Sequence, residues 1–399
     1  MPGDVPPNNP LAHLLGFART AIWMLAFNCL QNLALAPRAA VGASVVGRPR
    51  LSVLVPARDE AANIATCVRG LLAQTYPADE ILVLDDRSTD GTAAIVQALA
   101  AEPGGETLRL VPGDERPAGW NGKNWACHQL GEAARGDWLL FTDADTSHGP
   151  DSLAAALALA RRHDADFVSL LPRQVLGSLG ERLLVPQLPL VIYAFLPIAL
   201  VPRKGRWARA FAGAFGPYLL FRRAWYEALG GFASVKGLFS EDMQLAVATK
   251  RRGGRLVLAD GAAVVACRMY GGFADAWGGM ARNALPGALG SGAVYWPFVL
   301  AWAALFALPP ATVIALAARC LAGRRSAPPP LARLALGAMG GQLALRLAVG
   351  YRHHWPMRDV ALQPLGAVLM LGVFVDSWRR HRTGAITWRG RRYPGRTTP

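Results

Sequence analysis

The stretch Trp138-Leu-Leu-Phe-Thr-Asp-Ala-Asp145 runs from four bulky apolar residues into two carboxylates one residue apart. Such a run is typical of a strand buried on both faces that ends at a cleft. In an extended chain Asp143 and Asp145 would point to the same side, because side chains alternate. One hypothesis is a Mg²⁺ or Mn²⁺ ion between them, bound to a diphosphate. The other is an ordinary aspartate-rich turn, and the motif alone favours this turn, because so short a pattern occurs by chance.

Strands and helices alternate around this stretch. Continuous apolar runs predict strands, and helical spacing of apolar residues between them predicts helices. The predicted strands are 51–57, 81–86, 108–112, 138–145 and 167–172, and the predicted helices are 60–74, 92–101, 124–134 and 151–163. Short connections between them predict a doubly wound α/β sheet. Asp85 and Asp86 end the second strand, so two strands deliver acids to the edge where such sheets bind ligands.

The composition favours a membrane and argues against nucleic acid. Of the 399 residues, 52% are hydrophobic, and the apolar residues collect toward both ends of the chain. The formal net charge is +15, but residues 293–399 alone hold 14 arginines, no lysine and only two acids. Basic residues between and after apolar segments are typical of cytoplasmic loops of membrane proteins. The five cysteines form no C-x-x-C pair, which suggests a reducing compartment without disulfides.

Apolar segments predict how the chain is divided. The predicted parts are an N-terminal membrane anchor with a basic linker (1–50), an α/β domain (51–292), a C-terminal transmembrane region (293–380) and a basic tail (381–399). The anchor centres on 21–36, and the C-terminal region holds three apolar blocks at 293–318, 331–349 and 361–376. If all three blocks cross a bilayer, one basic loop and the tail lie opposite the α/β domain. That conflicts with the positive-inside tendency, so one block could be re-entrant or interfacial.

Two further segments carry local predictions. The apolar stretch 183–202 holds several prolines, whose missing backbone donors lipid cannot replace, so we expect a membrane-interface element rather than a span. Residues 240–250 predict a helix with Ser240 as its N-cap. Glu241 and Asp242 would lie in its first turn, where the helix dipole favours acids, and this structural role alone could explain them.

Four motifs follow one another between residues 51 and 285. They are VPARDEAANI (55–64), QTYPADEILVLDDRSTDGT (74–92), the Asp-Ala-Asp, and Ser-Glu-Asp (240–242). On these motifs the chain resembles a membrane-bound family-2 glycosyltransferase of the GT-A fold, a Rossmann-like α/β domain. A narrower resemblance is to the hopanoid-biosynthesis-associated and carotenoid glycosyltransferases. It rests on PAGWNGKNWA (117–126), YGGFADAW (270–277) and the tail ITWRGRRYP (386–394).

The resemblance implies a role for each matching residue. The residues that would hold the donor nucleotide are Pro56, Ala57, Arg58, Glu60, Asp86, Lys123 and Asp143. Asp145 would be the principal metal ligand, with Asp143 on the ribose or sharing the ion, and Asp242 would be the general base. Many membrane members carry Q-x-x-R-W after the base. Here Gly279-Met-Ala-Arg-Asn283 keeps only the arginine, so Arg282 is the candidate diphosphate contact.

The implied reaction is an inverting, metal-dependent transfer of a sugar to a membrane lipid. The donor would be a nucleotide-diphosphate sugar, the acceptor a hopanoid, carotenoid or similar hydroxyl lipid, and the cofactor Mg²⁺ or Mn²⁺. The protein would be a multi-pass protein of the cytoplasmic (inner) membrane, with the catalytic domain facing the cytoplasm. The expected partners are the donor, the lipid acceptor and the lipid bilayer, with no nucleic acid. Two alternatives stay open: a sugar transferase acting on polyprenyl phosphate, and a non-catalytic membrane scaffold that has kept the fold.

Overall fold

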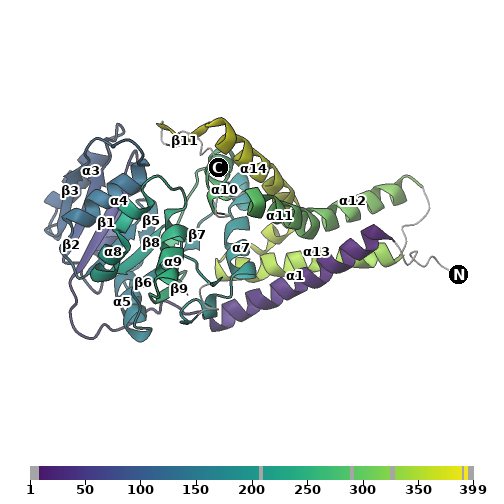
Figure 1. Cartoon of the computed structure of the whole chain (residues 1–399), viewed down its shortest axis with the longest axis horizontal. Helices are drawn as coiled ribbons and strands as arrows, with labels where there is room; N and C mark the ends of the chain where they lie inside the picture. The colour runs from purple at the N-terminus through teal and green to yellow at the C-terminus, as the bar shows by residue number, and fades with distance from the viewer. Residues whose placement is uncertain (1–8, 206–209, 288–291, 324–328, 389–390, 394–399) are drawn as a thin grey trace.

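A seven-stranded sheet forms the centre of the α/β domain, which lies at the left of Figure 1, while long helices extend to the right. This computed structural model describes residues 9–205, 210–287, 292–323, 329–388 and 391–393. In spatial order the strands are β3 (Leu108–Pro112), β2 (Glu80–Asp85), β1 (Leu51–Ala57), β4 (Trp138–Thr142), β8 (Tyr218–Arg222), β6 (Phe167–Leu171) and β9 (Leu256–Asp260). The five strands predicted from apolar runs are therefore confirmed, with small shifts at their ends.

The sheet is doubly wound, as predicted, but β8 makes it mixed rather than fully parallel. β1, β2, β3 and β4 are parallel, and so are β6 and β9, but β8 lies antiparallel between β4 and β6. After β6 the chain stays at the carboxyl edge of the sheet, through two helices and residues 210–217. It therefore enters β8 from that edge and must run the opposite way. Residues 213–217 are consequently placed beside the carboxyl ends of the parallel strands.

Helices cover both faces of the sheet, so its strands are buried on each side. The helices over one face are α2 (Ile64–Leu72), α3 (Thr92–Ala101) and α5 (Ser152–Arg162), and those over the other are α4 (Gly122–Ala133), α8 (Arg223–Leu229) and α9 (Glu241–Arg251). Val53 packs toward the first group, and Leu54 toward the second. The second core continues without a break into the long helices, through Trp302 and Phe374. The two parts thus share one hydrophobic core.

A three-stranded sheet and two short helices connect these parts. The sheet has β10 (Val265–Cys267) between β5 (Thr146–His148) and β7 (Arg173–Gln174). The predicted interface element at 183–202 folds as the end of α6 (Leu179–Leu184), α7 (Gln187–Phe195) and a 3₁₀ turn, Ile198–Leu200. α7 packs against α1 and α13, described next. Its contact with a membrane surface stays a prediction.

The N-terminal helix is longer than the apolar core predicted at 21–36. α1 spans Pro10–Leu35, which is 26 residues. Its polar residues have defined partners: Asn28 donates to the carbonyl of Ala194 at 2.8 Å, and Asn32 to that of Tyr193 at 2.7 Å. The side-chain oxygen of Asn32 also accepts from the backbone N–H of Ile198 at 2.8 Å. These asparagines therefore satisfy backbone groups at the end of α7, which stops just before Pro197.

The first C-terminal block crosses its proline pair without breaking. α11 (Gly292–Trp302) continues through a π-helical stretch, Ala303–Ala307, into α12 (Leu308–Leu321). Pro309 has no N–H, so the carbonyl of Leu305, one α-helical turn earlier, loses its usual partner. The buried Gln342 donates to that carbonyl at 2.8 Å. Its helix, α13 (Pro329–Arg352), packs along both α1 and α12.

Three helices among the described residues are long and apolar enough to cross a membrane. They are Pro10–Leu35, Gly292–Leu321 and Met357–Thr383. The last combines a 3₁₀ segment, Met357–Leu362, with α14 (Gln363–Thr383), and is longer than the predicted block. α13, the second predicted block, is not one of the three and carries Arg333 and Arg346. α14 packs on α10 (Phe273–Gly287) of the α/β domain, as Figure 1 shows.

The last residue of β9 joins the helices to the sheet. The backbone N–H of Asp260 donates to the carbonyl of Pro37 at 2.8 Å, and that of Ala39 donates to the carbonyl of Asp260 at 2.9 Å. Arg352, at the end of α13, pairs with the Asp260 carboxylate. Both the chain leaving α1 and the end of α13 are therefore fixed to the sheet edge. The basic tail forms a small hairpin of β11 (Ile386–Trp388) and β12 (Arg391–Tyr393), whose side chains from residue 387 onward lie outside the described residues.

Candidate active site

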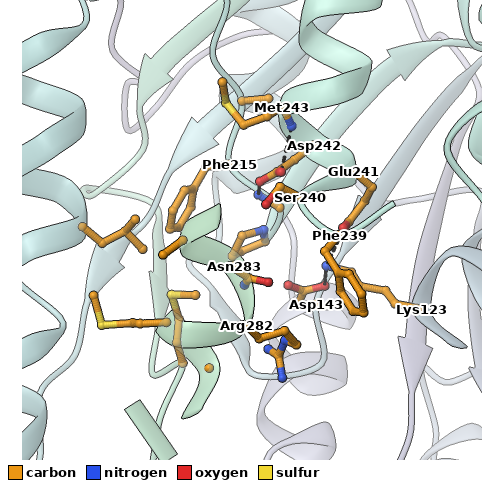
Figure 2. A pocket seen from close by; sticks show the side chains of 18 of the residues that line it. Lys123, Asp143, Phe215, Phe239, Ser240, Glu241, Asp242, Met243, Arg282 and Asn283 are labelled. Carbon is orange, nitrogen blue, oxygen red and sulfur yellow. Dashed lines mark hydrogen bonds and ion pairs between the residues drawn. The ribbon is translucent and has the colours of Figure 1, made fainter. Parts of the chain in front are cut away.

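One cleft of about 1260 Å³ opens at the carboxyl ends of the parallel strands. All ten residues predicted from the sequence line it: Pro56, Ala57, Arg58, Glu60, Asp86, Lys123, Asp143, Asp145, Asp242 and Arg282. Figure 2 shows Lys123, Asp143 and Glu241 facing one another, with Arg282 beside the same space. Six separate segments of the domain thus meet where the motifs predicted a site.

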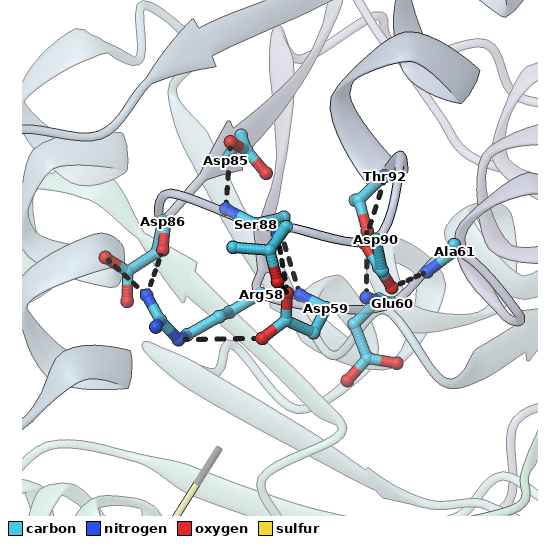
Figure 3. A network of polar contacts seen from close by, with 10 residues as sticks. Arg58, Asp59, Glu60, Ala61, Asp85, Asp86, Ser88, Asp90 and Thr92 are labelled. Carbon is cyan, nitrogen blue, oxygen red and sulfur yellow. Dashed lines mark hydrogen bonds and ion pairs between the residues drawn. The ribbon is translucent and has the colours of Figure 1, made fainter. Parts of the chain in front are cut away.

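Two loops that hold the nucleotide-motif residues are tied together by hydrogen bonds (Figure 3). The backbone N–H of Asp59 donates to Ser88 Oγ, and that of Glu60 to Thr92 Oγ1, both at 2.9 Å. Arg58 donates to the backbone carbonyl of Asp86 at 2.6 Å. The first loop follows β1 and the second follows β2, so neighbouring strands fix both at one edge. Arg58, Glu60 and Asp86 are held there as a single polar rim.

The Asp-Ala-Asp is a turn and not an extended segment. β4 ends at Thr142, and the backbone N–H of Thr146 donates to the carbonyl of Asp143 at 3.1 Å. The expectation that strand alternation places both carboxylates on one side is therefore wrong. Both acids nevertheless line the cleft, because the turn directs them there. Asp143 forms an ion pair with Lys123, and the distance from Oδ1 to Nζ is 2.8 Å.

The start of α9 supplies a second acid pair. Glu241 pairs with Lys123 at 3.0 Å, so this lysine lies between Asp143 and Glu241. Asp242 accepts from the backbone N–H of Gly216 at 2.8 Å and of Met243 at 2.7 Å. Ser240 stands at the N-cap position with a φ of 59°, but its side chain makes no capping hydrogen bond, contrary to our expectation.

Burial and charge shift the protonation of this group of residues. Burial, together with Asp143, raises the pKa of Asp145 to about 7. Burial, together with Glu241, raises the pKa of Asp242 to about 7. Burial opposes the charge on Lys123, but Asp143 and Glu241 outweigh it and keep the lysine pKa well above its usual value. The cleft therefore combines a lysine that stays charged with two aspartates, Asp145 and Asp242, whose pKa values burial brings close to neutrality.

The carboxylates at the turn suit a hard cation that is also bound by oxygens of a second molecule. Asp143 and Asp145 offer carboxylate oxygens, which Mg²⁺ and Mn²⁺ prefer. Cys267 Sγ lies 3.5 Å from Asp145 Oδ1, and burial raises the pKa of this thiol well above its usual range, so it stays protonated. Among the described residues, no three His, Cys, Asp or Glu side chains converge to hold an ion alone. The two aspartates fit an ion completed by diphosphate oxygens.

Arg282 is fixed in the cleft through α14. Its helix, α10, is bonded to α14 at three points: Trp277 Nε1 donates to Asp376 at 3.0 Å, Leu285 N–H to Ser377 at 3.1 Å, and the Arg282 carbonyl lies 2.9 Å from His381 Nε2. The position of this arginine therefore depends on a helix that belongs to a candidate membrane span. The sequence around Arg282 gives no sign of this dependence on α14.

Sequence reasoning missed several residues that border the cleft. Gly216 was not singled out, yet a Cβ there would lie 3.4 Å from Lys123 Nζ and 3.5 Å from Asp242 Oδ2. Glu241 was regarded as the lesser of two acids, but its pairing with Lys123 joins α9 to α4. Phe239 and Asn283 also border the space around Asp143 (Figure 2). The Gly216-Pro217 pair just before β8 was the one available signal.

A buried histidine near the turn is a core residue. His148 lies within hydrogen-bond distance of Thr142 Oγ1 at 3.1 Å and Ser152 Oγ at 3.3 Å. Burial lowers its pKa to about 3, so it is neutral. His148 therefore stabilises the turn that carries the two aspartates and does not line the cleft.

Comparisons with known proteins agree with this geometry. Residues 52–230 match the family model described as glycosyl transferase family 2. The chain is 24% identical over 354 residues to the 4,4'-diaponeurosporenoate glycosyltransferase of Staphylococcus aureus (strain MRSA252), covering 86% of this chain and 88% of that protein. Among solved structures it is similar to the mannosyltransferase PcManGT from Pyrobaculum calidifontis in complex with GDP-Man and Mn²⁺. That match has a TM-score of 0.57 and 23% identity, and covers 93% of this chain and 97% of that one.

The matched segment contains β1 to β8, the two tied loops and the Asp-Ala-Asp turn. The structural match extends over the long helices as well, since it covers nearly the whole of both chains. These observations agree with the fold and with the residues that the cleft brings together. Residues 52–230 therefore form a glycosyl transferase family 2 domain, and its fold is the GT-A fold.

Proposed function

We propose that this enzyme transfers a sugar from a nucleotide-diphosphate sugar to a hydroxyl group of a membrane lipid, with inversion at the anomeric carbon. The observation that carries the proposal is the meeting of two acid pairs in one cleft, with Lys123 between them. One pair follows a strand at the donor side, and the other begins a helix on the opposite wall. A direct displacement is helped by a carboxylate that takes the acceptor proton and by cations that stabilise the leaving diphosphate.

The donor would lie along the polar rim and the turn. Arg58, Glu60 and Asp86 contact the nucleoside, with Pro56 and Ala57 forming the floor beneath it. Lys123 and Arg282 are positioned to offset negative charge on the leaving diphosphate. The similar mannosyltransferase was solved with GDP-Man, which supports a nucleotide-sugar donor.

Asp145 and Asp143 would hold Mg²⁺ or Mn²⁺. When bound, such an ion stabilises the charge that develops on the leaving diphosphate. The Mn²⁺ in the complex of the similar mannosyltransferase supports a divalent ion here. Lys123, which pairs with Asp143 in this structure, would exchange part of that contact for a diphosphate oxygen.

Asp242 would act as the general base. The acceptor hydroxyl oxygen forms a bond to the anomeric carbon while the bond from that carbon to the diphosphate oxygen breaks. The hydroxyl proton passes to Asp242, and the bonding electron pair leaves with the diphosphate. One direct displacement inverts the anomeric centre. Hydrogen bonds from Gly216 and Met243 orient the carboxylate for this step.

The acceptor would be a membrane lipid such as a hopanoid, a carotenoid or a similar hydroxyl lipid. The support is the set of apolar helices that packs directly on the domain, together with the name of the similar Staphylococcus protein. We place the enzyme in the cytoplasmic membrane as a multi-pass protein. Its catalytic domain would face the cytoplasm, where nucleotide sugars are available.

Mass spectrometry of membrane lipids tests this proposal. Membranes from cells with and without the protein are extracted and compared, and we expect a lipid whose mass increases by one sugar residue only when the protein is present. Asp242→Asn should abolish that product. A product on a polyprenyl phosphate that survives Asp242→Asn would instead favour the phosphate acceptor, whose oxygen is already ionised and needs no base.

A further inference from the structure

The cleft is larger than the donor site at the strand edge requires. Pockets for small molecules usually measure about 300–1,000 Å³, and this one reaches about 1260 Å³. Its far part lies between α7, α11 and α14. We call this part the apolar arm and define it by Val191, Phe195, Phe298, Trp302, Met370 and Phe374.

Aromatic rings from all three helices form the wall of the apolar arm. The ring centroids of Phe195 and Phe298 are 6.4 Å apart, those of Phe298 and Phe374 5.5 Å, and those of Trp302 and Phe374 5.7 Å. These spacings are typical of favourable aromatic contacts. The wall is therefore a continuous apolar surface built from residues up to 179 positions apart in sequence.

Polar groups at this wall are satisfied within the protein. Trp302 Nε1 donates to the carbonyl of Ala367 at 2.9 Å, so the one polar atom of this buried ring has its partner within the protein. Gln187 also lines the cleft, but its amide exchanges hydrogen bonds of 3.1 and 3.2 Å with that of Gln363. A ligand in the arm thus meets apolar surface, while the charged groups lie at the other end of the cleft, around Asp242.

We infer that the apolar arm binds the hydrocarbon body of the acceptor and that its rings select which hydrocarbons are glycosylated. This inference rests on the proposed function. The arm is continuous with the space that contains Asp242, so a lipid lying in it brings its hydroxyl end to the base. α11 and α14 belong to candidate membrane spans, which places two of the three walls in apolar surroundings. The acceptor class is accordingly a long hydrocarbon with its hydroxyl at one end.

Chain-length dependence tests the inference with purified full-length protein. The acceptors are straight-chain primary alcohols from four to twenty carbons, presented in one detergent, and the donors are GDP-mannose, UDP-glucose and UDP-GlcNAc with Mn²⁺. For the wild type we expect kcat/KM to rise by up to about fourfold for each methylene that enters the arm. The rise should stop once the arm is full.

Two matched variants distinguish binding of the alcohol chain in the arm from partitioning of the alcohol into detergent. Val191→Trp fills the arm, and we expect it to lower the ratio of long-chain to short-chain kcat/KM at least tenfold. Val368→Trp makes the same change at a valine of α14 that is 45% exposed and does not line the cleft, and its ratio should match the wild type. Equal ratios in Val191→Trp and the wild type would overturn the inference.

Titration with the donor by calorimetry shows whether Val191→Trp folds. If it does not fold, a variant that widens the arm provides the test. Phe374→Ala should raise the kcat/KM for a fused-ring alcohol relative to hexadecanol several-fold, and an unchanged ratio would overturn the inference. If Val191→Trp removes a co-purifying lipid but keeps the acceptor profile, the arm holds a lipid that is not the substrate, and the inference also falls. Absence of transfer to every alcohol and lipid by the wild type would instead refute the proposed function itself.

Discussion

The two halves of the cleft are built in different ways. The polar half consists of short motifs that follow strands or begin helices, and each brings its charged side chains with it. The apolar half consists of α7, α11 and α14, which carry no motif and meet through packing and a few buried hydrogen bonds. Under the proposed function, chemistry at the anomeric carbon would be encoded in local motifs, whereas the choice of acceptor would be encoded in tertiary structure. Substitutions in the two halves should accordingly change different kinetic quantities.

The strongest test of the polar half is Asp242→Asn. Removing a general base usually costs about 10²–10⁴ in rate, so kcat for a hydroxyl acceptor should fall by that factor. Donor affinity, measured by calorimetry, reports whether the cleft stays folded. A kcat within tenfold of wild type would show that Asp242 is not the base.

The next largest effect is expected for Asp145→Ala. Removing the principal metal ligand should weaken Mn²⁺-dependent donor binding by more than the roughly 10–100-fold that loss of an outer-shell partner costs. Titration of the donor with and without Mn²⁺ measures it. Glu102→Ala, which removes an exposed acid at the end of α3, is the control. Donor affinity that still responds to Mn²⁺ in Asp145→Ala would contradict the assignment.

The pH dependence of transfer should reflect Asp242. The general base must be ionised, and burial raises its pKa to about 7. At saturating metal and donor, kcat should therefore be constant well above pH 7 and fall about tenfold per unit well below it. Saturating metal keeps Asp145 ionised, so its own titration does not contribute. A profile flat from pH 5 to pH 8 would exclude a base with this pKa.

The smallest effect is expected in the apolar half, at the Gln187–Gln363 pair. Gln363→Leu leaves the buried Gln187 oxygen without its donor and should cost about 1–3 kcal/mol of stability. The double variant with leucine at both positions should recover much of the loss, because both polar groups are then gone. Thermal unfolding in detergent, followed by tryptophan fluorescence, measures the cycle. Losses that simply add would show that the two amides do not interact.

The polar half was largely predictable because its signals are short. Apolar runs indicated the strands, and acids after them indicated the edge where ligands bind. The D-A-D turn shows the limit of that reasoning. Both acids line the cleft, as strand alternation predicted, but the predicted backbone was wrong. Ala144 is buried in a turn, and the chain is not extended there.

The remaining features depend on segments distant in sequence. Gly216 approaches Asp242 only because β8 enters the sheet antiparallel, and periodicity does not indicate strand direction. Asn32 lies in an apolar helix, and its partners, Tyr193 of α7 and Ile198 of the following turn, are distant in sequence. The apolar arm needed three helices placed by packing, so its residues were predictable as membrane-facing or core positions but not as one wall.

Bonds join Asp260 both to the chain after α1 and to Arg352. In the proposed arrangement, a helix that crosses the membrane and the catalytic sheet cannot move apart without breaking these bonds, so the bonds would fix the height of the cleft above the bilayer. The proposed enzyme would therefore select lipids by the depth of the hydroxyl group. A hydroxyl at the height of Asp242 would be glycosylated, and a chemically identical group held deeper in the bilayer would not react.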